Sequence, residues 1–191
     1  MPNPTWPNHK NIFQDSGLQL KEYRYYEAKT KGLNFNGLID DLKGAPEQSV
    51  ILFHACAHNP TGVDPTEQQW QGILDVCKQR HHIVFFDMAY QGYTSGNCEK
   101  DAYAVRLFEK AGIPIITAQS FAKNFGLYGQ RVGALSLVCE DQDEKARVLS
   151  QLKLVARPMY SNPPLAGARI VDTILSSPEL TKMWYSVRIN S

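Results

Sequence analysis

Three short apolar runs alternate with helical patterns in the middle of the chain, and this alternation constrains the fold more than any other feature. The runs are Val50–Cys56 (VILFHAC), Ile83–Phe86 (IVFF) and Ile113–Ala118 (IPIITA), each of strand length. Residues 67–78 and 100–111, which lie between them, show helical patterns. Strands separated by helices of this length form βαβ units, so the sequence predicts an α/β fold with a mostly parallel sheet.

Weaker patterns flank this central region. Residues 1–20 are predicted to be loop, since three prolines occur in the first seven positions. The other predicted elements are a short strand at Tyr23–Tyr26, a helix at Asn36–Lys43, a fourth core strand at Ala134–Cys139, and helices at Asp141–Val155 and Pro164–Leu175.

Composition excludes several classes of protein. Twenty Lys and Arg residues balance nineteen Asp and Glu residues, so neither nucleic acid nor an anionic membrane surface is expected as a partner. No apolar segment is long enough to span a membrane. The four cysteines form no CxxC pair, which argues against a disulfide framework or zinc module and favours a reducing compartment.

Polar side chains follow each predicted central strand at its carboxyl end, where parallel α/β sheets bind their ligands. In strand order they are His54, His58 and Asn59, then Asp87 and Tyr90, then Ser120 and Lys123. Alternate side chains of a strand share a face, so His54, Cys56 and His58 could approach one metal ion. No fourth ligand has suitable spacing nearby, and no metal site is expected.

Lys123 is the candidate nucleophile. A free lysine has a pKa of about 10.4, but desolvation or nearby positive charge lowers that value, and the neutral amine then forms an imine with an aldehyde. Ser120 lies three residues before it and Arg131 eight after, a hydroxyl and a cation suited to a phosphate. An aldehyde that carries a phosphate suggests pyridoxal phosphate. A surface lysine in a loop is the alternative.

Asp87 and Tyr90 suit the same ligand. Asp87 ends an apolar strand, where a carboxylate either caps a helix or pairs with another group. Paired with a protonated pyridine nitrogen, it would make the cofactor ring an electron sink. Tyr90 could donate a hydrogen bond to a phenolic oxygen.

Four motifs together resemble those of the aspartate aminotransferases, which are fold-type I pyridoxal-phosphate enzymes. They are HNPTG at 58–62, DMAYQGY at 87–93, SFAKNFGLYGQRVG at 120–133 and RPMYSNPP at 157–164. The resemblance runs from about Pro4 to the end of the chain and is closer to the mitochondrial form. It implies a three-layer α/β sandwich with a mostly parallel sheet, the large cofactor-binding domain of such enzymes.

The resemblance also implies a role for each matching residue. Lys123 would form the Schiff base with pyridoxal 5'-phosphate and later move a proton between the substrate and the cofactor. Asp87 would pair with the pyridine nitrogen, with His9 behind it in the same hydrogen-bond chain. Trp6 would stack on the cofactor ring, although it could also be a core residue.

The remaining roles concern the cofactor's oxygens and the substrate. Asn59 and Tyr90 would contact the phenolic oxygen, with Asn59 also near the substrate α-carboxylate. Ser120 and Arg131 would bind the phosphate. Arg157 would cross a homodimer interface to bind the distal carboxylate of aspartate or glutamate in the partner's site, or be a helix C-terminal charge favoured by the dipole.

The implied function is amino-group transfer between L-aspartate and 2-oxoglutarate in the mitochondrial matrix, with the cytoplasm as the alternative location. Family members are about twice as long as this chain. Residues 1–175 are therefore expected to form the large domain, incomplete at its N-terminus, and 176–191 to begin the helix leading to a C-terminal small domain. The alternative is a truncated, catalytically impaired isoform or fragment that acts only as a folding or dimerisation partner.

Overall fold

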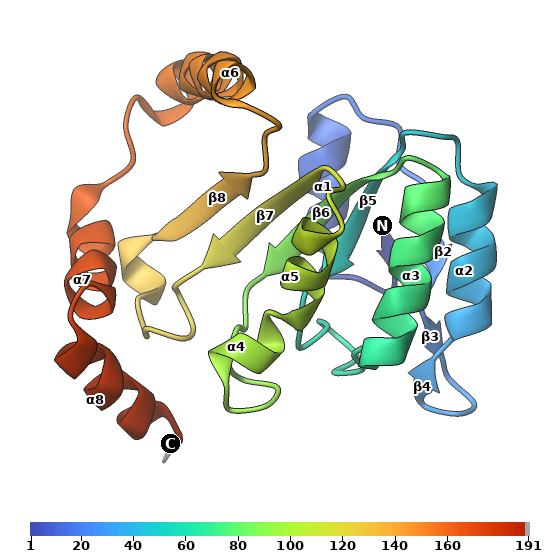
Figure 1. The fold of residues 1–191 in the computed structure, drawn as a ribbon, viewed down its shortest axis with the longest axis horizontal. Coiled ribbons are helices and arrows are strands. Elements are labelled where there is room, and N and C mark those ends of the chain that lie inside the picture. Colours follow the sequence, from blue (N-terminus) through green and yellow to red (C-terminus); the bar gives the residue numbers. More distant parts are fainter. Residues whose placement is uncertain (190–191) are drawn as a thin grey trace.

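The computed structural model describes residues 1–189, which are built around a four-stranded sheet (Figure 1). The strands are β5 (Val50–His54), β6 (Ile83–Met88), β7 (Ile115–Ser120) and β8 (Gly133–Leu137), in the order β5-β6-β7-β8. The first three are parallel, and β8 runs antiparallel to β7. The predicted α/β fold with a mostly parallel sheet is confirmed.

Two pairs of short strands accompany the sheet. β1 (Pro2–Asn3) pairs in parallel with β2 (Tyr23–Arg24), and β3 (Tyr26–Glu27) pairs antiparallel with β4 (Gly32–Leu33). The strand predicted at Tyr23–Tyr26 is therefore present, but it is divided between two pairings.

Helices cover both faces of the sheet. The helices α2 (Phe35–Gly44), α3 (Glu67–Gln79) and α5 (Tyr103–Lys110) lie over one face, and α1 (Asn8–Asp15) lies behind the other (Figure 1). The short helix α4 (Cys98–Asp101) precedes α5. Beyond β8 follow α6 (Gln142–Tyr160), α7 (Leu165–Leu175) and α8 (Pro178–Ile189).

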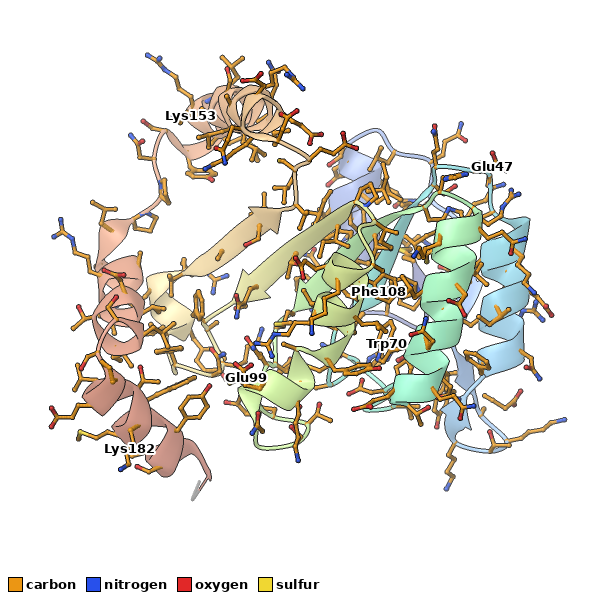
Figure 2. The ribbon with its side chains drawn as sticks, viewed as in Figure 1. Glu47, Trp70, Glu99, Phe108, Lys153 and Lys182 are labelled. Atoms are coloured by element: carbon orange, nitrogen blue, oxygen red, sulfur yellow. The ribbon has the colours of Figure 1, made fainter. Side chains whose placement is uncertain are left out.

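The main core lies between the sheet and helices α2, α3 and α5. Phe53 and Phe86 are paired in register on neighbouring strands and point to this face. They meet Trp70 of α3 and Phe108 of α5, with ring centroids 5.3 to 6.3 Å apart and mostly edge-to-face geometry. Figure 2 shows Trp70 and Phe108 directed inward, whereas Glu47 lies at the periphery.

Local sequence explains why α3 forms where predicted. Thr66 accepts a hydrogen bond from the backbone N–H of Gln69, whose side chain in turn accepts from the Thr66 N–H, which completes a capping box. Apolar residues recur at helical spacing and face the core; they are Trp70, Ile73, Leu74 and Cys77. The helix therefore begins and packs as the sequence dictates.

The opposite face of the sheet carries the polar residues. His54 and Asp87 are register partners on β5 and β6, and alternation places them on the face away from Phe53 and Phe86. Helix α1 covers this region, with the Phe13 ring edge-on to Phe85 at 6.0 Å. The candidate site residues His54 and Asp87 therefore lie on this face of the sheet.

The prediction that residues 1–20 form loop is wrong, because α1 occupies Asn8–Asp15. Pro7 stands directly before the helix, where a missing N–H costs nothing. No side chain caps the helix N-terminus. Burial of His9 against the sheet, rather than a strong local signal, accounts for a helix at this position.

Two predicted helices have different bounds. The helix expected at 100–111 is divided at Ala102 into α4 and α5. The helix expected to end at Val155 continues to Tyr160 and includes Pro158. Helix α8 covers most of the segment 176–191, whose last two residues lie outside the described residues; the division into two domains stays a prediction.

Within residues 1–189, no helix is long and apolar enough to cross a membrane.

Candidate active site

The candidate site lies at the carboxyl ends of β5, β6 and β7. Asp87 is the register partner of both His54 on β5 and Ala118 on β7, so it stands at the centre of this edge. Ser120 ends β7 and leads into the loop that carries Lys123. The sheet thus brings residues from three separate segments to one edge, as parallel topology requires.

A chain of hydrogen bonds connects Asp87 to His9, Thr5 and His54. His9 Nε2 lies 2.9 Å from Asp87 Oδ2, and His9 Nδ1 lies 2.9 Å from Thr5 Oγ1. Thr5 Oγ1 also lies 3.0 Å from His54 Nε2, and His54 Nδ1 accepts from the Asn59 backbone N–H at 3.3 Å. Four segments of the chain are joined in this way.

The proton positions in this chain follow from its fixed end. A backbone N–H only donates, so His54 Nδ1 accepts and, in a neutral ring, Nε2 carries the proton. That proton is donated to the Thr5 oxygen, and at the other end of the chain His9 Nε2 donates to Asp87, because a carboxylate only accepts. Burial lowers the pKa of His54 to about 4, which keeps the ring neutral near pH 7.

Lys123 and Tyr90 face each other across two loops. The Lys123 ammonium lies 4.9 Å from the centroid of the Tyr90 ring, within the range of a cation–π contact. The Tyr93 hydroxyl donates to the Lys123 backbone carbonyl at 3.0 Å, which ties the lysine loop to the loop after β6. Both loops are therefore held at the same edge of the sheet.

Ser120 and Arg131 line a small cavity of about 240 Å³ together with Gln119, Ala122, Val132 and Gly133. A Cβ on Gly133 would lie 2.6 Å from the Gln119 carbonyl oxygen, so this wall requires glycine. Arg131 adopts a left-handed φ of 51°, and its Nη1 donates to the Tyr128 carbonyl at 2.8 Å. A serine and an arginine thus line the same cavity.

A larger cavity of about 600 Å³ lies elsewhere, between α2, β2 and the start of β5. Its lining includes Leu18, Leu42 and Ile51 but no predicted site residue, so its size does not make it the site.

Trp6 and Asn59 also lie at this edge. The Trp6 ring is 39% exposed and packs edge-to-face on His9, with centroids 5.2 Å apart, so it is not a core residue. Asn59 follows His58, whose buried ring stacks on Tyr25 at 3.9 Å. Burial lowers the pKa of His58 to about 3, which indicates a neutral, structural ring.

Arg157 does not join the cluster. It lies exposed in the last turn of α6, the helix that follows β8 (Figure 1). Its place in the last turn fits the alternative of a charge at a helix C-terminus. An exposed side chain at this position is also compatible with the expected contact to a partner subunit.

Thr5 was missed by the sequence analysis. It occupies a proline-rich loop, and no local pattern distinguishes it from an ordinary turn residue. Its hydroxyl gains a role only because the fold brings His9 and His54 to either side of it.

Comparisons with known proteins agree with this geometry. A family model described as aminotransferase class I and II matches residues 1–189. The mitochondrial aspartate aminotransferase of Xenopus tropicalis is 57% identical over 184 residues, which are 96% of this chain and 43% of that protein. The chain thus spans less than half the length of this relative.

Solved structures of relatives have the same fold. A mitochondrial aspartate aminotransferase from Trypanosoma brucei superposes with a TM-score of 0.96 at 50% identity, covering 99% of this chain and 50% of that one. An aromatic-amino-acid aminotransferase from Burkholderia pseudomallei, covalently bound to pyridoxal phosphate, also has a TM-score of 0.96, at 46% identity, with 99% of this chain and 47% of that one covered. Motifs, site geometry and comparisons lead to one conclusion: the chain belongs to the class I and II aminotransferase family.

Proposed function

We propose that this chain forms the cofactor-binding part of an aspartate aminotransferase that uses pyridoxal 5'-phosphate. The reaction transfers the amino group of L-aspartate to 2-oxoglutarate and gives oxaloacetate and L-glutamate. The observation that carries the proposal is the placement of the His9–Asp87 pair and Lys123 at one sheet edge, beside the cavity lined by Ser120 and Arg131.

The residues present fit the cofactor in their chemistry. Asp87 uses Oδ2 to accept from His9, and a carboxylate accepts several hydrogen bonds, so Oδ1 suits a pyridinium N–H. Ser120 and Arg131 offer a hydroxyl and a guanidinium to a phosphate, in a cavity whose glycine wall permits close approach. Lys123 supplies an amine for the aldehyde.

Each residue then has a defined task. Lys123 Nζ would hold the cofactor at its aldehyde carbon and, as a free amine, would accept a proton from the substrate α-carbon. His9 would hold Asp87 in place through its Nε2–H, which leaves Oδ1 to accept a hydrogen bond from the ring nitrogen. When bound, the protonated pyridine ring stabilises negative charge at the substrate α-carbon.

Asn59 and Tyr90 would donate hydrogen bonds to the cofactor's phenolic oxygen, and Trp6 would cover the ring face. Asn59 would also approach the substrate α-carboxylate. These assignments rest on the motif resemblance and on the shared sheet edge, where all three residues are at least partly exposed.

The proposed partner is a second copy of this chain. None of the residues of α6 is buried, although the helix carries large apolar side chains, among them Leu154, Val155 and Met159 at 62%, 59% and 72% exposure. Apolar surface of this kind marks an interface. Arg157 lies on the same helix and, in a homodimer, would bind the distal carboxylate of the substrate in the partner's site.

Pairing alone is the second candidate function, and the same exposed helix favours it. In that case the chain would act as a folding or dimerisation partner without turnover.

Matrix localisation is proposed from the mitochondrial names of the curated relatives. A yeast structural relative is a cytoplasmic enzyme, and the cytoplasm is the alternative.

Cofactor capture separates the two candidates. The purified chain is mixed with pyridoxal phosphate, reduced with borohydride and mapped by mass spectrometry. We expect an adduct on Lys123 that is absent in Lys123→Ala. Labelling spread over surface lysines, unchanged by Lys123→Ala, would show that the site does not bind the cofactor and would leave the pairing function.

Substrate class is tested separately in the loaded protein. Addition of L-aspartate should change the absorbance of the bound cofactor at lower concentration than L-phenylalanine, because Arg157 would bind a distal carboxylate across the proposed homodimer interface. An equal response to both amino acids would contradict dicarboxylate selectivity. Arg157→Leu should remove the preference for aspartate while the Lys123 adduct remains.

A further inference from the structure

Two loops at the site edge carry the residues proposed to contact the phenolic oxygen. Residues 55–65 follow β5 and contain Asn59, and residues 89–97 follow β6 and contain Tyr90. Neither loop is a helix or a strand, so side-chain contacts must fix their relative position. Two aspartates and one threonine supply those contacts.

Asp64 holds the turn that precedes Asn59. Its Oδ2 accepts from the Ala57 N–H at 2.6 Å and its Oδ1 from the His58 N–H at 2.9 Å. Ala57 has a φ of 48°, in the left-handed region that is unfavourable for a residue with a Cβ. The Asp64 carboxylate therefore stabilises a strained turn one residue away from the Asn59 backbone N–H that enters the histidine chain.

Asp101 holds the other loop. It is a carboxylate of 6% exposure with four donors around it. Oδ2 accepts from the N–H groups of Gly92 and Thr94, at 2.6 and 3.1 Å, and Oδ1 accepts from the Ser95 N–H and hydroxyl, at 3.1 and 2.6 Å. A buried carboxylate with this many partners fixes the backbone around it.

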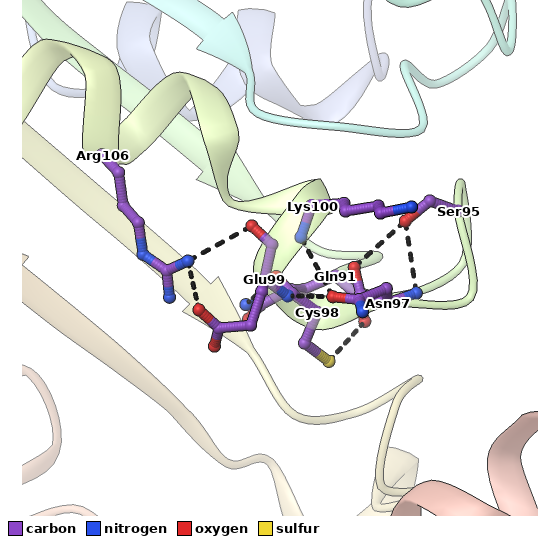
Figure 3. Close-up of polar contacts among 7 residues, drawn as sticks. All are labelled: Gln91, Ser95, Asn97, Cys98, Glu99, Lys100 and Arg106. Atoms are coloured by element: carbon purple, nitrogen blue, oxygen red, sulfur yellow. Dashed lines mark hydrogen bonds and ion pairs between the residues drawn. The ribbon is translucent and has the colours of Figure 1, made fainter.

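Further hydrogen bonds join the same loop to the start of α4. Figure 3 shows Asn97 accepting from the first N–H groups of α4, and Gln91 donating to the Cys98 carbonyl at 3.0 Å. Arg106 of α5 pairs with Glu99. These contacts therefore attach the loop after β6, which Asp101 also binds, to helices α4 and α5.

Thr94 joins the two aspartates. Its N–H donates to Asp101 Oδ2, and its hydroxyl donates to Asp64 Oδ2 at 3.2 Å. Its neighbour Tyr93 donates to the Lys123 carbonyl on the third loop. Adjacent hydroxyls thus tie the loop after β6 to the loops on both of its sides.

We propose that the Asp64–Thr94–Asp101 bridge is a positioning device that sets Asn59 against Tyr90, with Thr94 as its replaceable link. The proposal rests on the proposed function for its consequence, since two donors aimed at one anionic oxygen stabilise it only at the right spacing. None of the three residues is among those proposed to contact the cofactor. They act through Asn59 and Tyr90.

Thr94→Val tests the link because it removes the hydroxyl and keeps both the shape and the N–H that Asp101 accepts. Thr94→Ser restores a hydroxyl at the same place. Thr30→Val is the matched control: its hydroxyl bonds only the Glu27 carbonyl, at 3.5 Å, in the β3–β4 turn. The positions of Asn59 and of the amides of Ala57 and His58 are read from ¹H–¹⁵N spectra of the cofactor-free chain.

The cofactor gives the second readout. Pyridoxal phosphate binding is measured by absorbance titration, and the pH midpoint of the bound cofactor's spectrum is recorded. Thr94→Val should weaken binding by about threefold to tenfold, the loss expected for one hydrogen bond of ordinary net strength. It should also raise the pH midpoint, since a less well bound phenolic oxygen holds its proton more tightly. Thr94→Ser should restore both values, and Thr30→Val should change neither.

The outcomes are separable. Unmoved Asn59, Ala57 and His58 signals in Thr94→Val would overturn the bridge, whether or not cofactor binds. Moved signals with unchanged affinity and unchanged pH midpoint would overturn its role toward the cofactor. Absence of binding to the wild-type chain would refute the proposed function instead, and the amide signals alone would then decide the bridge.

Discussion

His9 Nε2 lies 2.9 Å from Asp87 Oδ2 and so joins helix α1 to the carboxyl end of β6 across 78 residues of sequence. The His9 ring is buried and is oriented on its other side by Thr5. A carboxylate held in this way has Oδ2 engaged by the histidine and keeps Oδ1 as a further acceptor. The arrangement makes α1 a part of the candidate site rather than a peripheral helix.

Removal of the His9 contact should weaken cofactor binding. His9→Ala leaves the Asp87 carboxylate without its histidine donor, a loss of about 1.5–3 kcal/mol for a charge-assisted hydrogen bond. We therefore expect pyridoxal phosphate to bind at least tenfold more weakly in an absorbance titration. Thr5→Val keeps the direct contact and should have a smaller effect; an effect as large as that of His9→Ala would contradict the assignment.

Arg131 should contribute to binding only when the ligand carries a phosphate. Arg131→Ala is expected to weaken pyridoxal phosphate binding by about 2 kcal/mol, within the range for hydrogen bonds to charged groups, and to leave pyridoxal binding unchanged. Fluorescence titration with both ligands measures the difference. Equal weakening for the two would show that Arg131 acts on the loop and not on the phosphate.

Stability should fall as the pH is lowered from 7 toward 4. Burial, aided by His9 and opposed by Asp87, lowers the folded-state pKa of His54 to about 4, and burial lowers that of His58 to about 3. In the unfolded chain both titrate near 6.5. The unfolded state therefore binds more protons in this window, so the stabilisation is complete above pH 6.5 and is lost as the pH falls toward the folded values.

Protonation of each of these two histidines on unfolding should lower the free energy of unfolding by about 2 kcal/mol at pH 5 relative to pH 7. Urea denaturation at the two pH values measures the loss. His54→Asn should reduce it, whatever its effect at pH 7, and His81→Asn at an exposed site should leave it as in the wild type. An identical loss in His54→Asn would show that His54 is not responsible.

Substitution of Phe108 in the aromatic core should lower the stability of the fold. This side chain has no exposed surface and contacts the rings of Phe53, Trp70 and Phe86. Phe108→Ala should lower the free energy of unfolding by about 3–5 kcal/mol, and Phe108→Leu by much less, because a smaller cavity remains. Equal losses in the two variants, measured by urea denaturation, would argue against a cavity as the cause.

Much of this fold follows from local sequence. The three central strands and α3 were predictable because apolar runs of strand length, a helical period and a capping box at Thr66 each act over a few residues. Strand ends then gave the predicted positions of Asp87, Ser120 and Lys123 at one edge, since parallel strands share a direction.

Local sequence failed where distant contacts decide the conformation. Helix α1 has no side-chain cap at its start and forms against the sheet through His9 and Phe13. Helix α6 passes through Pro158, which a local rule reads as an end. The role proposed for Arg157 also lies beyond local rules, because it would depend on a partner subunit.

The sequence by itself determined the α/β class, the order of the central strands and helices, and the residues that reach the sheet edge, because periodicity and strand direction are local properties. Only the tertiary structure decided which side chains meet. Thr5 between His9 and His54, and Thr94 between Asp64 and Asp101, join segments that are distant in sequence. Hydrogen bonds of this kind depend on the packing of whole elements, and no residue pattern encodes them.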